Sequence, residues 1–241
     1  MRIGIFSAKG GVGKTTFAIN FAGSLLCFEK NPLLIDTDLN NSLSISLGLI
    51  NYNLNLSRAL NFEIPINNAI YLTPFGLRVL PTGDSNLNYK NINILNDLEG
   101  SFDFLVIDTE PGISEKNLEI AKICDEIFLL TLPETTSIYA LMRIVKEFEK
   151  ENIKITGIIV NRYTKKSISP NEIFDISGIP VLAVLPEDTK IKESLNKGIP
   201  YVFYNPYSSF TIEIKSLASN FLGIPYKKPS FLFLKKWLSF I

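Results

Sequence analysis

Apolar residues along the chain occur in short runs rich in Ile, Leu and Val, which alternate with longer segments of helical periodicity. This alternation is typical of parallel strands that crossover helices bury on both faces. We predict strands at residues 2–6, 32–36, 103–108, 126–132, 154–160 and 180–185, with a weaker pair at 69–73 and 77–80. The pattern therefore predicts an α/β fold with a mostly parallel central sheet and helices on both of its faces.

Two segments repeat apolar residues with the spacing of one helix face. The first follows strand 2–6 and comprises Phe17, Ala18, Phe21, Ala22, Leu25 and Leu26. The second comprises Ile138, Leu141, Val145 and Phe148. Residues 223–230 contain two prolines and a glycine and indicate a linker. We therefore expect one domain over residues 1–222, followed by a linker and tail helix over 223–241.

The composition is that of an ordinary globular protein, 46% hydrophobic and 20% charged over 241 residues. The chain has no His, which excludes Ser/His/Asp triads and His-ligated zinc sites. Cys27 and Cys124 lack the paired spacing of a thiolate metal site or a disulfide framework, which favours a reducing compartment. Lys and Arg number 24, as do Asp and Glu, so no net charge attracts nucleic acid. We expect neither a signal peptide nor a membrane-spanning segment.

The segment SAKGGVGKTT, residues 7–16, follows strand 2–6 and opens a predicted helix. Three glycines, at which a side chain would block phosphate, let backbone N–H groups turn inward: Gly10, Gly11 and Gly13. Lys14 then supplies a charge for the β and γ phosphates, and Thr15 supplies a hydroxyl for Mg²⁺. The alternative is a glycine-rich turn that merely starts a helix. The order of strand, loop, Lys-Thr and helix favours a phosphate site.

The same segment departs from the strict GxxxxGK[ST] pattern, because Ala8 replaces the first glycine and Lys9 is added. KGGVGKTT resembles the deviant Walker A loop of the MinD/ParA family, whose signature is this extra lysine. The resemblance implies a Rossmann-like P-loop NTPase fold, ATP and Mg²⁺ as ligands, ATP hydrolysis, and a homodimer that encloses the nucleotide. It implies catalytic roles for Lys9, which reaches phosphate across the dimer interface, and Lys14. The implied nucleotide contacts are Lys9, Gly10, Gly11, Val12, Gly13, Lys14, Thr15 and Thr16.

Strand 32–36 ends in Asp36-Thr37-Asp38, which is similar to switch I of that family. The resemblance implies that Asp38 orients the attacking water and belongs to the Mg²⁺ site. The alternative is that Asp36 and Asp38 cap the strand end or the next helix. The residues after Asp38, LNNSLSISLG, differ from the forms usual in the family.

DFLVID, residues 103–108, resembles a Walker B strand that delivers Asp108 to the Mg²⁺ shell. The next residues, TEPG at 109–112, resemble switch II, whose glycine amide, here Gly112, senses the γ phosphate. Glu110 stands where a proline is usual. At this position the chain resembles nickel-insertion ATPases of the same superfamily. Those enzymes carry a CxC metal site that this chain lacks.

Two later segments resemble the family's base-binding loops. Asn161 and Arg162 close strand 154–160, where the family's Asn reads the adenine edge. Pro186, Glu187 and Asp188 follow strand 180–185, at the second base-contact loop. Each segment alone could be a simple turn. The NKxD motif of guanine-specific enzymes is missing from the sequence, and ATP is therefore preferred.

The last eleven residues, FLFLKKWLSFI, predict an amphipathic helix. Its polar sector holds Lys235, Lys236 and Ser239, and Leu232 intrudes on that side. Its apolar half holds Phe231, Phe233, Leu234, Trp237, Leu238, Phe240 and Ile241. The segment looks like the membrane-targeting helix of MinD proteins. The alternative is a last helix that docks on the domain's own core.

The combined expectation is a MinD-like ATPase, cytoplasmic and peripheral on the inner face of the cell membrane. It would bind an anionic membrane surface as an ATP-bound homodimer, leave on hydrolysis, respond to an activating or effector protein, and position cell division or another structure. One alternative is a ParA-type partition ATPase that binds DNA through a patch at Arg162, Lys165 and Lys166; zero net charge makes DNA the less favoured partner. Metal-insertion ATPases and flagellar-number regulators of the same family are further alternatives.

Overall fold

The computed structural model describes residues 1–83 and 88–229. Within these ranges the strands form one sheet of eight, in the order β3-β4-β2-β5-β1-β6-β7-β8. The strands are β1 (Arg2–Phe6), β2 (Pro32–Asp36), β3 (Tyr71–Leu72), β4 (Arg78–Leu80), β5 (Phe104–Asp108), β6 (Glu126–Thr131), β7 (Gly157–Tyr163) and β8 (Val181–Pro186). All neighbours are parallel except β3 and β4. The predicted fold class is confirmed, and every predicted strand has a counterpart.

The prediction for the seventh strand is wrong at both ends. It placed the strand at 154–160, whereas β7 starts at Gly157 and runs to Tyr163. The backbone N–H and the hydroxyl oxygen of Thr156 both bond to the backbone of Ile127, so the ladder with β6 starts one residue later. Beyond Val160 the strand shifts register around Arg162 and pairs Tyr163 with Pro186. The shift explains why a hydrophobic run that ends at residue 160 did not mark the true end.

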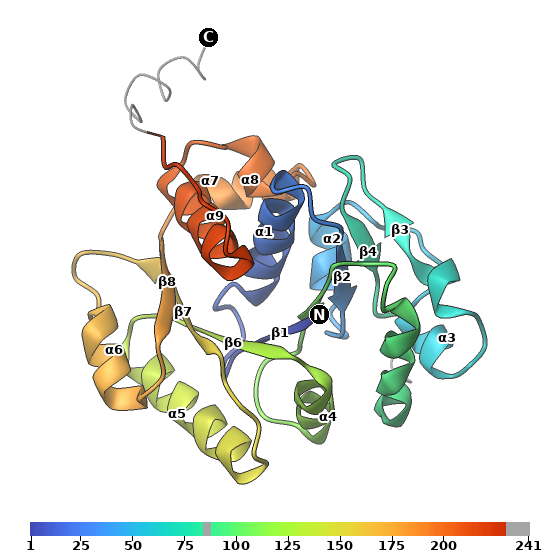
Figure 1. Cartoon of the computed structure of the whole chain (residues 1–241), viewed down its shortest axis with the longest axis horizontal. Coiled ribbons are helices and arrows are strands. Elements are labelled where there is room, and N and C mark those ends of the chain that lie inside the picture. Colours follow the sequence, from blue (N-terminus) through green and yellow to red (C-terminus); the bar gives the residue numbers. More distant parts are fainter. Residues whose placement is uncertain (84–87, 230–241) are drawn as a thin grey trace.

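Helices cover both faces of the sheet (Figure 1). They are α1 (Lys14–Cys27), α2 (Ser42–Ser46), α3 (Leu56–Leu60), α4 (Glu115–Ile123), α5 (Thr135–Lys150), α6 (Pro170–Ser177), α7 (Lys190–Asn196), α8 (Tyr201–Tyr204) and α9 (Ser209–Leu222), with 3₁₀ helices η1 (Ile66–Ala69) and η2 (Tyr89–Leu98). In Figure 1, α1 and α9 lie above the sheet, whereas α4, α5 and α6 lie below it. The core is accordingly split into two clusters, one on each face.

The two predicted helix faces supply much of this core. On α1, Phe17, Phe21 and Leu25 are fully buried, and Phe21 packs edge-on against Phe128 of β6 at 5.6 Å between ring centroids. On α5, all four predicted face residues are buried against the opposite side of the sheet. A buried large apolar side chain contributes about 1.5–3 kcal/mol, so these two faces hold both layers to the strands.

The last described segment lies against the domain rather than apart from it. The ring of Tyr226 meets that of Phe28 edge-on at 5.9 Å, and the Lys228 ammonium is 2.9 Å from a carboxylate oxygen of Glu213. The predicted membrane contacts Phe231, Phe233, Leu234, Lys235, Lys236, Trp237, Leu238, Phe240 and Ile241 lie outside the described residues. Among the residues that are described, no helix combines the length and hydropathy needed to span a bilayer.

Strand register fixes where the candidate chemistry meets. Asp108 at the end of β5 is aligned with Ile5 of β1 on one side and with Asp36 of β2 on the other. The carboxyl ends of these three parallel strands therefore form one edge. Ligands of open α/β sheets bind outside this edge.

Candidate functional site

The loop between β1 and α1 needs glycine at two positions. Gly11 and Gly13 have φ of 74° and 96°, which side chains rarely tolerate. A Cβ on Gly13 would also lie 2.5 Å from Nδ2 of Asn161, so contact excludes it as well. That same Nδ2 donates to the carbonyl oxygen of Val12 at 2.8 Å and ties the loop to β7. The result is a fixed turn of backbone N–H groups at the start of a 14-residue helix, an arrangement suited to phosphate.

The predicted phosphate-binding side chains lie around this turn. Lys14 is the first residue of α1 and is buried. Thr15 donates its hydroxyl to Oδ2 of Asp108 at 2.6 Å, which joins the loop to the end of β5. Lys9 is half-buried, and its side chain makes no ion pair with any residue that the structure describes. Gly10 faces switch II, because a Cβ there would come 3.7 Å from Pro111.

Three carboxylates, those of Asp36, Asp38 and Asp108, are buried at this edge of the sheet. Burial raises the pKa of Asp108 to about 6, although the Lys14 charge and the hydrogen bond from Thr15 lower it. Burial also raises the pKa of Asp36 well above its ordinary value, and the charge of Asp108 adds to that effect. Within the described part of the chain, Oδ2 of Asp36 and Oδ1 of Asp108 are buried without a hydrogen-bond partner. A cation bound beside these two oxygens would satisfy them and would favour the ionised form of both carboxyl groups.

The donor set fits Mg²⁺ on these grounds. A hydroxyl from Thr15 and a carboxylate from Asp108 are adjacent, and both have the oxygen chemistry that Mg²⁺ prefers. Over residues 1–83 and 88–229, no group of three or more His, Cys, Asp or Glu side chains could enclose a metal ion.

Neither Asp36 nor Asp38 is the N-cap residue of the following helix, although a backbone hydrogen bond from Ser44 in its first turn helps to stabilise the Asp36 carboxylate. Oδ1 of Asp36 accepts from the backbone N–H of Asp38 at 3.0 Å. Oδ1 of Asp38 accepts two bonds from Asn40, one from its backbone N–H and one from its side-chain amide. The residue before α2 is Asn41. These local bonds instead hold the two carboxylates in place at the end of β2.

Switch II lies against the phosphate loop. Gly112, with φ of 93°, donates its N–H to the carbonyl oxygen of Ser7 at 2.8 Å. Glu110 forms an ion pair with Lys116 of α4 at 2.7 Å. The amide predicted to sense a γ phosphate is therefore beside the loop that would hold it.

A pocket of about 500 Å³ extends from the phosphate loop to the ends of β7 and β8. It brings together all of the predicted base-contact residues, namely Asn161, Arg162, Pro186, Glu187 and Asp188, with Gly13 and Thr16 of the loop. Arg162 has φ of 54°, a conformation uncommon for a residue with a side chain, at the register shift of β7. Asp188 is held by a hydrogen bond from the Tyr201 hydroxyl.

Sequence reasoning missed one wall of this pocket. The additional lining residues are Ser46 of α2, together with Thr189, Ile191, Lys192, Leu195 and Asn196 at and within α7. The signal was available for α7, because Ile191 and Leu195 are four residues apart directly after the predicted base loop. Ser46 carried no such signal, because only tertiary folding brings α2 beside the loop. A larger groove, of about 690 Å³ between α5 and α6, contains none of the predicted site residues.

Comparison with known proteins agrees with this geometry. Residues 3–201 match the family described as the CobQ/CobB/MinD/ParA nucleotide binding domain. The chain belongs to this family. An uncharacterised ATP-binding protein of Methanocaldococcus jannaschii is similar to this chain, with 30% identity over 95% of this chain and 93% of its own length.

Solved structures of the family place the chain close to MinD. The septum site-determining protein MinD of Pyrococcus horikoshii, complexed with Mg-ADP, is 31% identical and superposes with a TM-score of 0.84 over 91% of this chain and 95% of its own. A MinC:MinD cell division protein complex from Aquifex aeolicus is 26% identical, with a TM-score of 0.85 over 94% and 98% of the two chains. The resemblance inferred from the phosphate loop is thereby confirmed at the level of the family, and its closeness to MinD is confirmed as well.

Proposed function

We propose that this chain is a MinD-like ATPase that binds Mg-ATP, dimerises around it, attaches to a membrane in that state and is released after hydrolysis. The observation that carries the proposal is the Thr15–Asp108 hydrogen bond beside two unpartnered buried carboxylate oxygens. Gly13 and Thr16, which flank Lys14 and Thr15 in the same loop, line a 500 Å³ pocket that leads to Asn161 and the loop at Pro186. The phosphate loop therefore borders both the carboxylate cluster and the pocket at the base end.

Hydrolysis of the γ phosphate is assigned to charge and positioning, as phosphoryl transfer requires. Lys14 neutralises phosphate charge from the buried start of α1. Asp38 orients the attacking water, and Asn40 fixes the carboxylate by two hydrogen bonds to Oδ1. Gly112 exchanges its bond to Ser7 for a bond to the γ phosphate. A Mg²⁺ ion held by Thr15, Asp108 and the phosphates, with Asp38 close by, would supply charge neutralisation at the transferred group.

The ATP-bound state is proposed to be a homodimer. Lys9 supports this, because it is half-buried in the loop without an ion-pair partner among the described residues and so has a charge available for phosphate. The solved MinD complex with MinC supports a protein partner of the assembled form as a further proposal. That partner would determine which cellular structure the protein positions.

Membrane attachment is proposed for the tail at 231–241, whose sequence would place lysines on one side of a helix and aromatic residues on the other. A single short amphipathic helix binds a bilayer weakly, because ordering and incomplete insertion offset its apolar contacts. Two tails on one dimer gain a factor of order 10² to 10⁴ from effective concentration. Dimerisation would therefore switch the protein between solution and membrane, with localisation at the inner face of the cell membrane.

Co-sedimentation with anionic liposomes tests the proposal. The full chain should pellet with ATP and remain in solution with ADP or without nucleotide. A truncation after Pro229 and the variant Lys9→Ala should both stay in solution, although the truncation should still hydrolyse ATP. Equal pelleting in every nucleotide state would refute the switch. Binding to duplex DNA that weakens steeply with salt would instead support a partition ATPase.

A further inference from the structure

Glu110 does not extend into solvent but is tied to α4. Its Oε2 is 2.7 Å from the Lys116 ammonium, and its Oε1 accepts the Ser114 hydroxyl at 2.9 Å. Only 13% of the Lys116 side chain and 26% of the Glu110 side chain are exposed. A partly buried ion pair of this kind is screened less by salt than a surface pair.

The same ammonium also contacts a third element. Lys116 lies 4.6 Å from the ring centroid of Tyr89, the first residue of η2. The Tyr89 hydroxyl in turn donates to the carbonyl oxygen of Thr37 at 3.3 Å. Burial and the charges of Glu110, Asp36 and Asp38 raise the pKa of Tyr89 well above its ordinary value, so this hydroxyl keeps its proton and acts as a donor.

Thr37 is the residue between the two switch I carboxylates. Its backbone N–H and its hydroxyl both donate to the carbonyl oxygen of Asp108 at 2.9 Å, so its backbone is held from one side by β5 and from the other by Tyr89. A shift of the Thr37 carbonyl group, which accepts the bond from Tyr89, would rotate the peptide that leads into Asp38. The position of Asp38 therefore depends on the hydrogen bond from the Tyr89 hydroxyl to Thr37.

At the other end, the side chain of Asn117 on α4 holds the backbone of switch II. The amide of Asn117, a buried residue, donates to the carbonyl oxygens of both Glu110 and Gly112, at 3.0 and 2.9 Å. A movement of Gly112 toward a γ phosphate would pull on Glu110 and on the N-terminal turn of α4 together. Lys116 belongs to that turn and would transmit the movement to Tyr89.

We propose that Glu110, Lys116 and Tyr89 form a switch bridge, through which switch II (109–112) positions the switch I backbone at Thr37 and Asp38. The three are positioning residues, and their role in turnover rests on the proposed ATPase function.

Hydrogen exchange of the nucleotide-free full-length protein tests the bridge without relying on activity. Glu110→Gln and Tyr89→Phe each remove one link while keeping the shape of the side chain. Each should speed amide exchange in residues 37–41 by about 3- to 10-fold, the equivalent of one net hydrogen bond. The double variant should exchange no faster than the faster single variant, because both substitutions break one chain of contacts.

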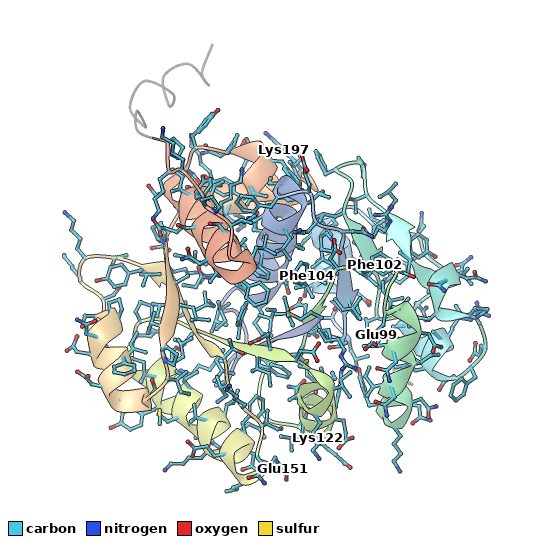
Figure 2. The ribbon with its side chains drawn as sticks, in the orientation of Figure 1. Glu99, Phe102, Phe104, Lys122, Glu151 and Lys197 are labelled. Atoms are coloured by element: carbon cyan, nitrogen blue, oxygen red, sulfur yellow. The ribbon has the colours of Figure 1, made fainter. Side chains whose placement is uncertain are left out.

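Two controls separate the bridge from a general loss of stability. Glu119→Gln breaks another ion pair on the same helix, to Lys122, and should leave exchange at 37–41 unchanged. Figure 2 shows Lys122 beside Glu151, where α4 and α5 come together. Lys116→Arg keeps the positive charge, so amide exchange at 37–41 should proceed at nearly the wild-type rate in this variant.

Turnover measured on the same variants adds a second readout. Glu110→Gln and Tyr89→Phe should lower kcat by about 3- to 10-fold with KM within about twofold of wild type, again without summing in the double variant. Unchanged exchange at 37–41 in either single variant, or effects that sum in the double variant, would overturn the bridge. Wild-type protein without ATP turnover would instead contradict the proposed function, and the exchange experiment would still decide the bridge.

Discussion

The two halves of the candidate nucleotide site are built differently. The phosphate half lies at the ends of β1, β2 and β5, where Asp36, Thr37 and Asp108 are fully buried. The base half lies at β7 and β8 near the sheet's edge, and most of its lining residues are partly exposed. A buried group cannot be replaced without leaving charge or polarity unmatched, whereas a partly exposed one can fall back on water. Substitutions in the phosphate half should therefore lower nucleotide affinity and turnover far more than substitutions in the base half.

The largest effect is expected for Asp108→Asn. Loss of the carboxylate should lower ATP turnover by at least about 10²- to 10³-fold, because it removes charge from the Mg²⁺ site. The nucleotide-free variant should nevertheless be more stable than wild type. Burial raises the pKa of Asp108 from 3.8 to about 6, and ionising it in the folded state at pH 7 costs up to about 3 kcal/mol.

The sign of this stability effect is testable by pH. The folded pKa of Asp108 lies above the unfolded value, so its destabilising ionisation develops between pH 4 and about pH 6 and is complete at neutral pH. Thermal unfolding of both proteins from pH 7.5 down to pH 5 should show the advantage of Asp108→Asn shrinking as pH falls. An advantage that grows toward low pH would contradict the buried, unmatched carboxylate.

Gly13→Ala should produce the next largest effect, on affinity. The added Cβ meets Nδ2 of Asn161 and also requires an unfavourable φ, so the phosphate loop must move. We expect nucleotide affinity to fall by about 100-fold, measured by titration with a fluorescent ATP analogue. Gly178→Ala is the matched control, since Gly178 has φ of 68° at the end of α6 and a Cβ added there would have nothing within 4 Å. It should cost similar backbone strain and leave affinity unchanged.

The smallest effect is expected in the base half, for Asn196→Ala. This residue lines the pocket from the end of α7, where it is exposed and water can replace it. Affinity for ATP should fall by about threefold or less in the same titration. A loss as large as that of Gly13→Ala would show that the two halves are equally constrained, and the comparison between them would fail.

The sequence predicted which segments meet at the ends of β1, β2 and β5, because each segment is short and directly follows a strand. Loop 7–16, Asp36-Thr37-Asp38 and Thr109 to Gly112 each follow a buried strand directly, and parallel pairing brings strand ends together. For the base half, the sequence predicted only the residues at the carboxyl ends of strands β7 and β8. Its far wall, from Ser46 and α7, depends on how helices pack across the loop.

Other parts of the fold carried too weak a local signal. Residues 39–70 form only short helices, α2, α3 and η1, whose length is below that at which periodicity is informative. The β7 bulge depends on Arg162 adopting a positive φ, which no propensity anticipates. Glu110 was recognised as unusual, but its partner Lys116 and the contact to Tyr89 follow from tertiary packing alone.

The proposed function depends above all on ATP joining two copies of this chain. The most direct measurement is the solution mass by light scattering with Mg²⁺ and a non-hydrolysable ATP analogue. We expect a species of twice the 27.0 kDa monomer mass with the analogue, a monomer with ADP, and a monomer for Lys9→Ala in either state. A wild-type chain that binds the analogue and remains a monomer would contradict the proposed function.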